Sequence, residues 1–234
     1  MTSPLNGKTV IVIGGSSGIG AAVAEAAMVR GAHVILAGRR LSSTTDDGVR
    51  SEPVDVTDPA SLQRLFERVG HFDHLVYTSG PSVRANPLSE TDLEQAQDNF
   101  NVKLWGALRA IQRALPFLDE RGSISLTSGQ LGRKLVPGQF IKVGINAATE
   151  ALGKQLAKEL APRRVNVISP GVIDTPAYAG LAEESRLAMF AKAGNALPVG
   201  RVGQAEEVAA GYVLAMENGY MTGAVIDIDG GGLL

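Results

Sequence analysis

Short apolar segments of strand length alternate along the chain with longer segments whose apolar residues recur at helical spacing. This alternation is typical of β-α-β units around a parallel sheet whose strands are buried on both faces. The pattern predicts strands over Thr9–Ile13, His33–Ala37, His74–Thr78, Ser123–Thr127, Arg164–Ile168 and Val225–Ile228, with a weaker one near Ser51–Val54. It predicts helices over Gly18–Arg30, Pro59–Val69, Leu88–Leu118, Gly144–Leu160, Ala182–Ala193 and Ala205–Met216.

These elements together predict a doubly wound α/β fold of the Rossmann type, with a parallel sheet of about seven strands and helices on both faces. No linker, internal repeat or low-complexity tract divides the chain, and the polar segment Leu41–Gly48 is interpreted as a loop. Residues 1–234 are therefore expected to form a single domain.

The strongest motif lies where the first predicted strand runs into the first predicted helix, in VIVIGGSSGIGAAVAEAAMVRGA. Gly14, Gly18 and Gly20 suit a tight bend, close approach of the backbone to a pyrophosphate and close packing of the helix on the strand. The start of the helix adds backbone N–H groups and the positive end of its dipole. A turn whose glycines serve packing alone is the alternative. The motif predicts a dinucleotide site formed by Gly14, Ser16, Ser17, Gly18, Ile19 and Gly20.

The spacing Gly-x-x-x-Gly-x-Gly resembles that of the short-chain dehydrogenase/reductase family, which has a threonine where this chain has Ile13. The resemblance continues along almost the whole chain. PVDVTD is similar to the family's adenine-contacting Asp-Val pair, YTSG to its Asn-Asn-Ala-Gly, and SPGVIDTP to its Pro-Gly-x-x-x-Thr loop beside the nicotinamide. It implies a substrate lid around residues 176–203 and further cofactor contacts from Asp55, Val56, Gly80, Pro170, Gly171, Ile173 and Thr175.

The residues after the second predicted strand indicate which nicotinamide cofactor binds. About 20 residues past the glycine turn, an acidic side chain normally binds the ribose hydroxyls of NAD, and here Gly38 stands at that place. Arg39 and Arg40 follow at once, and a guanidinium can pair with a 2′-phosphate through charge-assisted hydrogen bonds. NADP(H) is therefore the expected cofactor, with Arg39 the better candidate and Arg40 assisting. Two solvated loop arginines are the alternative.

The expected catalytic residues depart from the family's pattern. EALGKQLAKELAP resembles the sequence after the family's Tyr-x-x-x-Lys, and counting back from Glu150 puts Asn146 in the lysine position and Lys142 in the tyrosine position. NFNVKLWGA resembles the helix with the family's active-site Asn, and GSISLTSG the strand with its Ser. Lys142 is either a substitute proton donor or a solvent-directed side chain, in which case Asn146 remains a ribose contact. The candidate catalytic residues are Asn101, Ser128 (more weakly Thr127), Lys142 and Asn146.

Composition and charge narrow the range of partners. A net charge of −2 without a basic run predicts no binding to nucleic acid or to an anionic membrane. No segment has the length of a membrane span or the pattern of a signal peptide, so a cytoplasmic protein is expected. The chain has no cysteine and no cluster of metal ligands, so no catalytic metal is expected. His33, His71 and His74 stand at predicted strand beginnings, away from the carboxyl ends where ligands bind.

These features lead to an expected function and an alternative. We expect an NADP(H)-dependent oxidoreductase that reduces a small carbonyl or related substrate with a non-standard active site. A non-catalytic NADP(H)-binding protein, a sensor or an assembly partner, is the alternative. The predicted helices Leu88–Leu118 and Gly144–Leu160 resemble the family's four-helix subunit interface, so a homodimer or homotetramer is also expected.

Overall fold

The computed structural model describes residues 3–39, 41, 44–46, 49–81, 83 and 85–234, and an eight-stranded sheet forms its centre. The strand order is β10-β7-β6-β5-β1-β2-β4-β3, and every pair except β3 and β4 is parallel. The strands are β1 (Thr9–Ile13), β2 (His33–Gly38), β3 (Thr44–Asp46), β4 (Val49–Pro53), β5 (Phe72–Tyr77), β6 (Leu118–Thr127), β7 (Arg164–Pro170) and β10 (Val225–Ile228). Seven parallel strands between helices confirm the predicted doubly wound fold.

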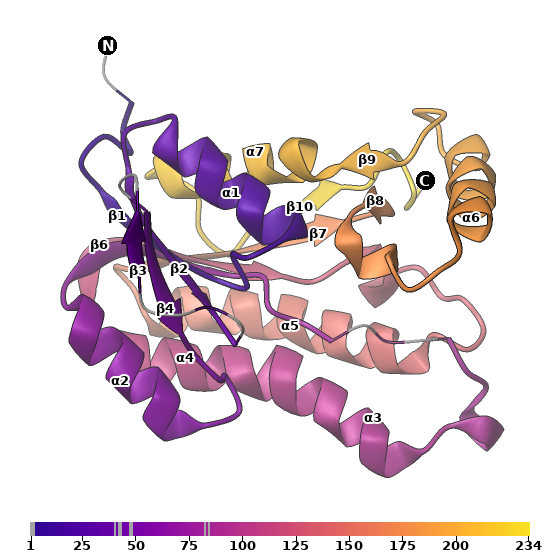
Figure 1. The fold of residues 1–234 in the computed structure, drawn as a ribbon, viewed down its shortest axis with the longest axis horizontal. Coiled ribbons are helices and arrows are strands. Elements are labelled where there is room, and N and C mark those ends of the chain that lie inside the picture. The colour runs from indigo at the N-terminus through magenta and orange to yellow at the C-terminus, as the bar shows by residue number, and fades with distance from the viewer. Residues whose placement is uncertain (1–2, 40, 42–43, 47–48, 82, 84) are drawn as a thin grey trace.

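Helices cover both faces of this sheet (Figure 1). One face carries α1 (Gly18–Met28) and α7 (Ala205–Glu217), and the other carries α2 (Pro59–Val69), α4 (Gly106–Ala114) and α5 (Phe140–Glu159). Alternate residues of β1 serve the two cores: Val10 and Val12 pack toward α1 and α7, whereas Ile11 and Ile13 pack toward α2 and α4. None of the helices in the described part of the chain is long and apolar enough to cross a membrane.

The predicted helix Leu88–Leu118 was wrong as a single element. The structure divides it into a short 3₁₀ turn η1 (Leu88–Glu90), α3 (Leu93–Phe100), the π-helical turn η2 (Asn101–Trp105) and α4. The division begins at Asp92, whose carboxylate accepts hydrogen bonds from Glu94 N and Gln95 N and so caps α3. A cap of this kind starts a new helix even where the apolar spacing continues.

Three other boundaries also differ from the prediction. The predicted loop Leu41–Gly48 contains β3, which pairs antiparallel with β4 at the sheet edge. β6 starts at Leu118 rather than at Ser123, and α5 starts at Phe140 rather than at Gly144. The earlier start of α5 follows the turn at Gly138, where φ is +76° and a helix cannot continue backward. The same change brings Lys142 and Asn146 onto one continuous helix.

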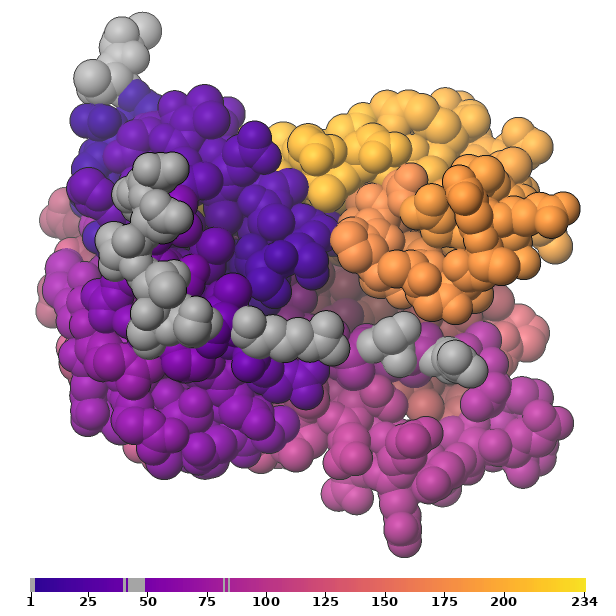
Figure 2. Space-filling model, in the orientation of Figure 1, coloured from indigo at the N-terminus to yellow at the C-terminus, as the bar shows by residue number. Residues whose placement is uncertain are grey.

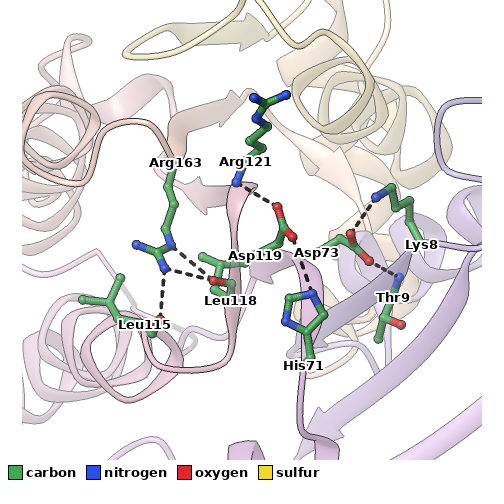
Figure 3. Close-up of polar contacts among 9 residues, drawn as sticks. All are labelled: Lys8, Thr9, His71, Asp73, Leu115, Leu118, Asp119, Arg121 and Arg163. Atoms are coloured by element: carbon green, nitrogen blue, oxygen red, sulfur yellow. Dashed lines mark hydrogen bonds and ion pairs between the residues drawn. The ribbon is translucent and has the colours of Figure 1, made fainter.

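The amino edge of the sheet is held by polar contacts between neighbouring elements (Figure 3). Asp73 accepts hydrogen bonds from Lys8 Nζ at 2.8 Å and from Thr9 N at 2.9 Å, which ties β5 to β1. Arg163 donates to the carbonyl oxygen of Leu118 at 3.0 Å and so ties the start of β7 to β6. His71 faces Asp119 at 3.5 Å on this same edge, as expected for a histidine at a strand beginning.

Protonation of His74 is expected to destabilise the fold in acid. Its Nδ1 lies 2.8 Å from Ser123 Oγ inside the sheet, and burial lowers the pKa of His74 to about 4. The unfolded chain takes up this proton near pH 6.5 while the folded chain does not, so the stabilisation is present above that pH and is lost as the pH falls toward 4. We expect the unfolding free energy in urea to drop by about 2–3 kcal/mol from this group between pH 7 and pH 4.5. In His74→Gln the fall in unfolding free energy between pH 7 and pH 4.5 should be smaller by that amount, and in the exposed control His71→Gln it should equal that of the unmodified protein. Equal falls in all three proteins would contradict a role for His74 in this acid sensitivity.

Candidate functional site

The glycine-rich turn lies between β1 and α1, at the carboxyl edge of the sheet (Figure 1). Gly14 has a φ of +93°, and a Cβ there would lie 2.6 Å from the backbone nitrogen of Ser79. A Cβ at Gly20 would collide with the carbonyl oxygen of Gly14 and lie 2.6 Å from Thr78 Oγ1. Side chains are excluded here because the turn, the start of α1 and the end of β5 are in direct contact.

The start of α1 is suited to an anion. Ser17 is its N-cap residue, but the Ser17 side chain makes no capping hydrogen bond, and the first turn contains no acidic residue. Backbone N–H groups and the positive end of the helix dipole are therefore directed at the turn. A Cβ at Gly18 would lie 3.4 Å from the Thr175 side chain, so the loop after β7 comes close to the same helix start. This arrangement fits a diphosphate.

The end of β2 lies beside the glycine turn. A Cβ at Gly38 would lie 3.9 Å from Ser16 Oγ, so the two predicted cofactor segments are adjacent. Arg39 follows on the surface and forms no ion pair with a described residue, although its charge helps to lower the pKa of Asp55. Arg40 lies outside the described residues. Within the described part of this segment, the end of β2 therefore offers the guanidinium of Arg39 and no carboxylate of its own.

The predicted Asp-Val pair has structural partners within the chain. Hydrogen bonds from the hydroxyl and the amide of Thr57 hold the pKa of Asp55 below its usual range, with lengths of 2.7 and 2.9 Å. Val56 is buried and lies against Gly106, where an added Cβ would approach it to 3.0 Å. A contact from Val56 to a cofactor therefore has to use its backbone.

Lys103 is at the centre of a group of polar contacts that joins η2, the end of β6 and α5. Its stem passes the end of β5, where a Cβ at Gly80 would lie 3.5 Å from Lys103 Cδ. The ammonium donates to Asn146 Oδ1 at 3.0 Å and to the carbonyl oxygen of Ser128 at 3.3 Å. Burial lowers the pKa of Lys103 to about 8, and the nearby charge of Lys142 contributes to this. The sequence analysis did not identify this residue.

Asn101 does not join this group. It is the first residue of the π-helical turn, and its Oδ1 accepts a hydrogen bond from Arg109 at 2.8 Å. Arg109, Trp105 and Asn101 line a separate surface depression. The prediction that Asn101 stands with the other catalytic candidates is therefore not supported by its position, because the turn directs Lys103, two residues later, toward Ser128 and Asn146.

The hydroxyl of Ser128 is also directed away from Lys103. It donates to Glu150 Oε1 at 3.1 Å, and Glu150 in turn binds Arg133 at 3.0 Å. Arg133 also pairs with Asp227, so this network, buried at Ser128 and Glu150 and part-exposed at Arg133, connects the end of β6 with α5 and β10. Only the backbone oxygen of Ser128 contacts Lys103, and the predicted role of its hydroxyl loses its geometric support. Thr127, the weaker alternative, is likewise occupied, since its hydroxyl donates to the carbonyl oxygen of Tyr77 at 2.7 Å.

Lys142 and Asn146 lie one turn apart on α5, which includes Lys142 because it begins before the predicted start at Gly144. Asn146 is buried and presents its amide nitrogen toward Gly129, where an added Cβ would lie 3.0 Å away. Lys142 is half-buried, and burial lowers the pKa of its ammonium. Among the described residues, no group of three His, Cys, Asp or Glu side chains could hold a metal ion.

The loop after β7 forms one wall of the site. Gly171 N donates to the carbonyl oxygen of Ile228 at 3.0 Å directly after Pro170, which ends β7. β8 (Ile173–Asp174) pairs with β9 (Gly203–Gln204), so the two ends of the intervening segment are held together. That segment contains η4 (Pro176–Tyr178) and α6 (Glu183–Asn195). Figure 2 shows the region around α6 (orange) and the region around α3 (magenta) projecting at the same end of the molecule.

Comparison with known proteins identifies the family. A family model described as enoyl-(acyl carrier protein) reductase matches residues 13–232. The short-chain dehydrogenase/reductase ATR9 of Stachybotrys chlorohalonatus is 32% identical, with 98% of each chain covered. This chain belongs to the short-chain dehydrogenase/reductase family. L-fucose dehydrogenase of Mus musculus is 36% identical, over 97% of this chain and 88% of the relative. A crystal structure of a small-chain dehydrogenase in complex with NADPH is 42% identical, with a TM-score of 0.86 and coverage of 97% and 99%.

The spacing of small residues after Lys103 indicates, from the sequence alone, that this lysine faces the protein interior. Lys103 precedes Gly106, Ala107 and Ala110 by three, four and seven residues, and these three small residues form part of the buried face of α4. A lysine in register with such a face requires a buried acceptor. Asn101, two residues earlier, matches the family's active-site asparagine by residue type, whereas Lys103 does not.

Adding a methyl group at Gly20 is expected to destabilise the protein, because the new Cβ has no space between the turn and β5. We expect Gly20→Ala to lower the unfolding free energy by about 1–3 kcal/mol in urea denaturation. The matched control is Gly219→Ala, since a Cβ at Gly219 meets no atom within 4 Å. Equal stability of the two variants would contradict the close contact.

Proposed function

We propose that this chain is an NADP(H)-dependent oxidoreductase that reduces a small carbonyl or related substrate with a non-standard set of catalytic residues. The observation that carries the proposal is the backbone contact at Gly14 and Gly20, which leaves an uncapped helix start facing the carboxyl edge of the sheet. In open α/β sheets dinucleotides bind at this edge, beside the two strands between which the strand order reverses. In this sheet the strand order reverses between β1 and β5.

The choice of NADP(H) follows from the end of β2. Gly38 provides no carboxylate to repel a 2′-phosphate, and Arg39 provides an exposed guanidinium that is not paired with a described residue. The relative with 42% identity, whose structure was solved with NADPH, supports the same choice. Gly14, Ser16, Ser17, Gly18, Ile19 and Gly20 would hold the diphosphate, and Gly80, Pro170, Gly171, Ile173 and Thr175 would line the nicotinamide half.

The substrate would bind between the nicotinamide half of this cleft and the segment 176–203, which we propose as a lid. β8 and β9 hold the two ends of the lid, and Tyr178 packs edge-on against Phe190 at 5.3 Å between ring centres. The bound cofactor supplies hydride, so the protein has to orient the carbonyl group and provide a proton. α5 contains no tyrosine for that purpose, and Lys142 and Asn146 occupy the predicted Tyr and Lys positions.

A non-catalytic dinucleotide-binding protein is the second candidate, and one observation favours it. The hydroxyl of Ser128 is bound to Glu150 and therefore does not offer the expected proton or hydrogen bond to a substrate. NADPH oxidation with a panel of aldehydes, ketones and enones separates the candidates. Turnover supports the oxidoreductase, and tight NADPH binding without turnover on the full panel supports the binding protein.

Arg39→Ala is expected to weaken NADPH binding roughly tenfold or more, because a charge-assisted contact to phosphate contributes about 1.5–3 kcal/mol. NADH binding should change little, since NADH carries no 2′-phosphate. Fluorescence titration with both cofactors measures the effect, and Arg121→Ala, at an exposed arginine on the opposite edge of the sheet, is the control. Equal losses for NADPH and NADH would remove Arg39 from this role.

We further propose a homodimer or homotetramer. The exposed side of the α3–α4 and α5 layer would form the subunit contact, with Trp105 as a large exposed apolar side chain on that layer. Light scattering at low micromolar concentration should report a mass of two or four chains. A monomer across that range would contradict the proposal.

A further inference from the structure

A single lysine connects three separate elements at the candidate active site. Lys103 comes from η2, passes Gly80 at the end of β5, and reaches the end of β6 and the buried amide of α5. An ammonium has three N–H donors, and the carbonyl oxygen of Ser128 and Oδ1 of Asn146 use two of them. The third N–H is left for another acceptor.

The turn that carries Lys103 is held in place from β5. The Tyr77 hydroxyl donates to the carbonyl oxygen of Val102 at 2.6 Å, within the π-helical turn. Gly106 makes room for that hydroxyl, since a Cβ there would lie 2.6 Å from it. π-helical turns leave backbone carbonyls displaced from the α-helical pattern and occur frequently at functional sites. Here the turn shifts Lys103 toward the sheet while Asn101 remains with Arg109.

The surroundings of Lys103 favour proton exchange near neutral pH. Burial lowers the pKa of Lys103 to about 8, and Lys142 on α5 lowers it further in the same direction. The carboxylate on the same helix, Glu150, is engaged by Arg133 and by Ser128. The end of β5 contributes Ser79 and Gly80, which carry no charge, and among the described residues no carboxylate bonds to Lys103. A general acid works best when its pKa lies near the working pH.

We propose that Lys103 is the catalytic acid of this enzyme and that Asn146 is the positioning residue that orients its ammonium. The proposal rests on the reductase function proposed above. As the carbonyl carbon accepts hydride, the electron pair of the C=O π bond moves to oxygen, and that oxygen takes a proton from Lys103 Nζ. The N–H bond breaks, a neutral amine remains, and the amine regains a proton from water.

The competing role for Lys103 is structural, in which its hydrogen bonds only hold η2, the end of β6 and α5 together. Replacement of Lys103 by arginine distinguishes this role from that of a catalytic acid. Lys103→Arg keeps the charge and the donors, but an arginine does not release its proton at accessible pH. Lys103→Met removes charge and donors together. The control is Lys154→Met, at an exposed position of α5. For a catalytic acid, both Lys103 variants should lose about 10²–10⁴-fold in kcat while NADPH binding stays within a few fold.

The pH profile tests the pair of Lys103 and Asn146. The acid must be protonated, so kcat should fall above about pH 8 in the unmodified protein. Asn146→Asp places a carboxylate beside the ammonium and should move this fall to higher pH by at least about one unit. Lys154→Met should leave the profile unchanged. A profile that does not respond to Asn146→Asp, or full activity in Lys103→Arg, would overturn the proposal.

A measurement that needs no substrate turnover tests the role of Lys103 independently of the proposed reductase function. Trace acetylation with acetic anhydride across a pH series, followed by peptide mass spectrometry, reports the titration of Lys103, with the acetylation of the exposed Lys154 as the internal reference for reagent reactivity. We expect Lys103 to titrate near pH 8, well below the ordinary lysine pKa of about 10.4. If no substrate on the panel turns over, the reductase proposal fails. A Lys103 that titrates at the ordinary lysine pKa of about 10.4 would overturn the present inference as well. If substrates turn over and Lys103→Arg is fully active, only the present inference fails.

Discussion

Three stretches of backbone touch at the carboxyl ends of β1 and β5, and the rest of the site depends on that contact. Gly14 and Gly20 have no side chain there because the Thr78–Ser79 segment occupies the space. Thr78 reinforces the junction, since its amide and its hydroxyl both donate to the carbonyl oxygen of Ile13. A bulkier residue would push α1 away from the sheet and remove the helix start from the cleft. The same junction sets the position of Gly80, past which Lys103 reaches the centre of the site.

The second element of the site is the interruption of a long helix. A continuous α-helix over this region would keep a regular 3.6-residue spacing. Instead, Tyr77 binds the carbonyl oxygen of Val102 within the π-helical turn, and Gly106 leaves space for the tyrosine ring. The local backbone thus carries a polar side chain into a region that an uninterrupted amphipathic helix would fill with apolar residues. Gly106 and the buried hydroxyl of Tyr77 therefore act on the position of Lys103 through the backbone of the π-helical turn.

Much of the fold followed from local patterns in the sequence. The strands could be predicted because buried parallel strands appear as compact apolar runs, and the glycine turn because its residues have a steric reason to lack side chains. Asn101 and Ser128 could not be placed in the same way. Their orientations depend on a change of helix type and on a buried network around Glu150, and both arise from contacts distant in sequence. Lys103 could be recognised in the sequence as a charged residue at helical spacing from the buried small residues of α4. Its acceptors, Ser128 and Asn146, could be identified only from the structure.

The contact between Lys103 and Asn146 couples the two helices that carry them. An Asn146→Lys replacement would remove the Oδ1 acceptor, which lies 3.0 Å from Lys103 Nζ, and would introduce a second ammonium in the neighbourhood of the first. Two like charges near each other in a half-buried setting oppose each other strongly. Position 146 can therefore become a lysine in this background only together with a change at position 103. The two positions are therefore coupled through one hydrogen bond, and the effect of a change at either depends on the residue at the other.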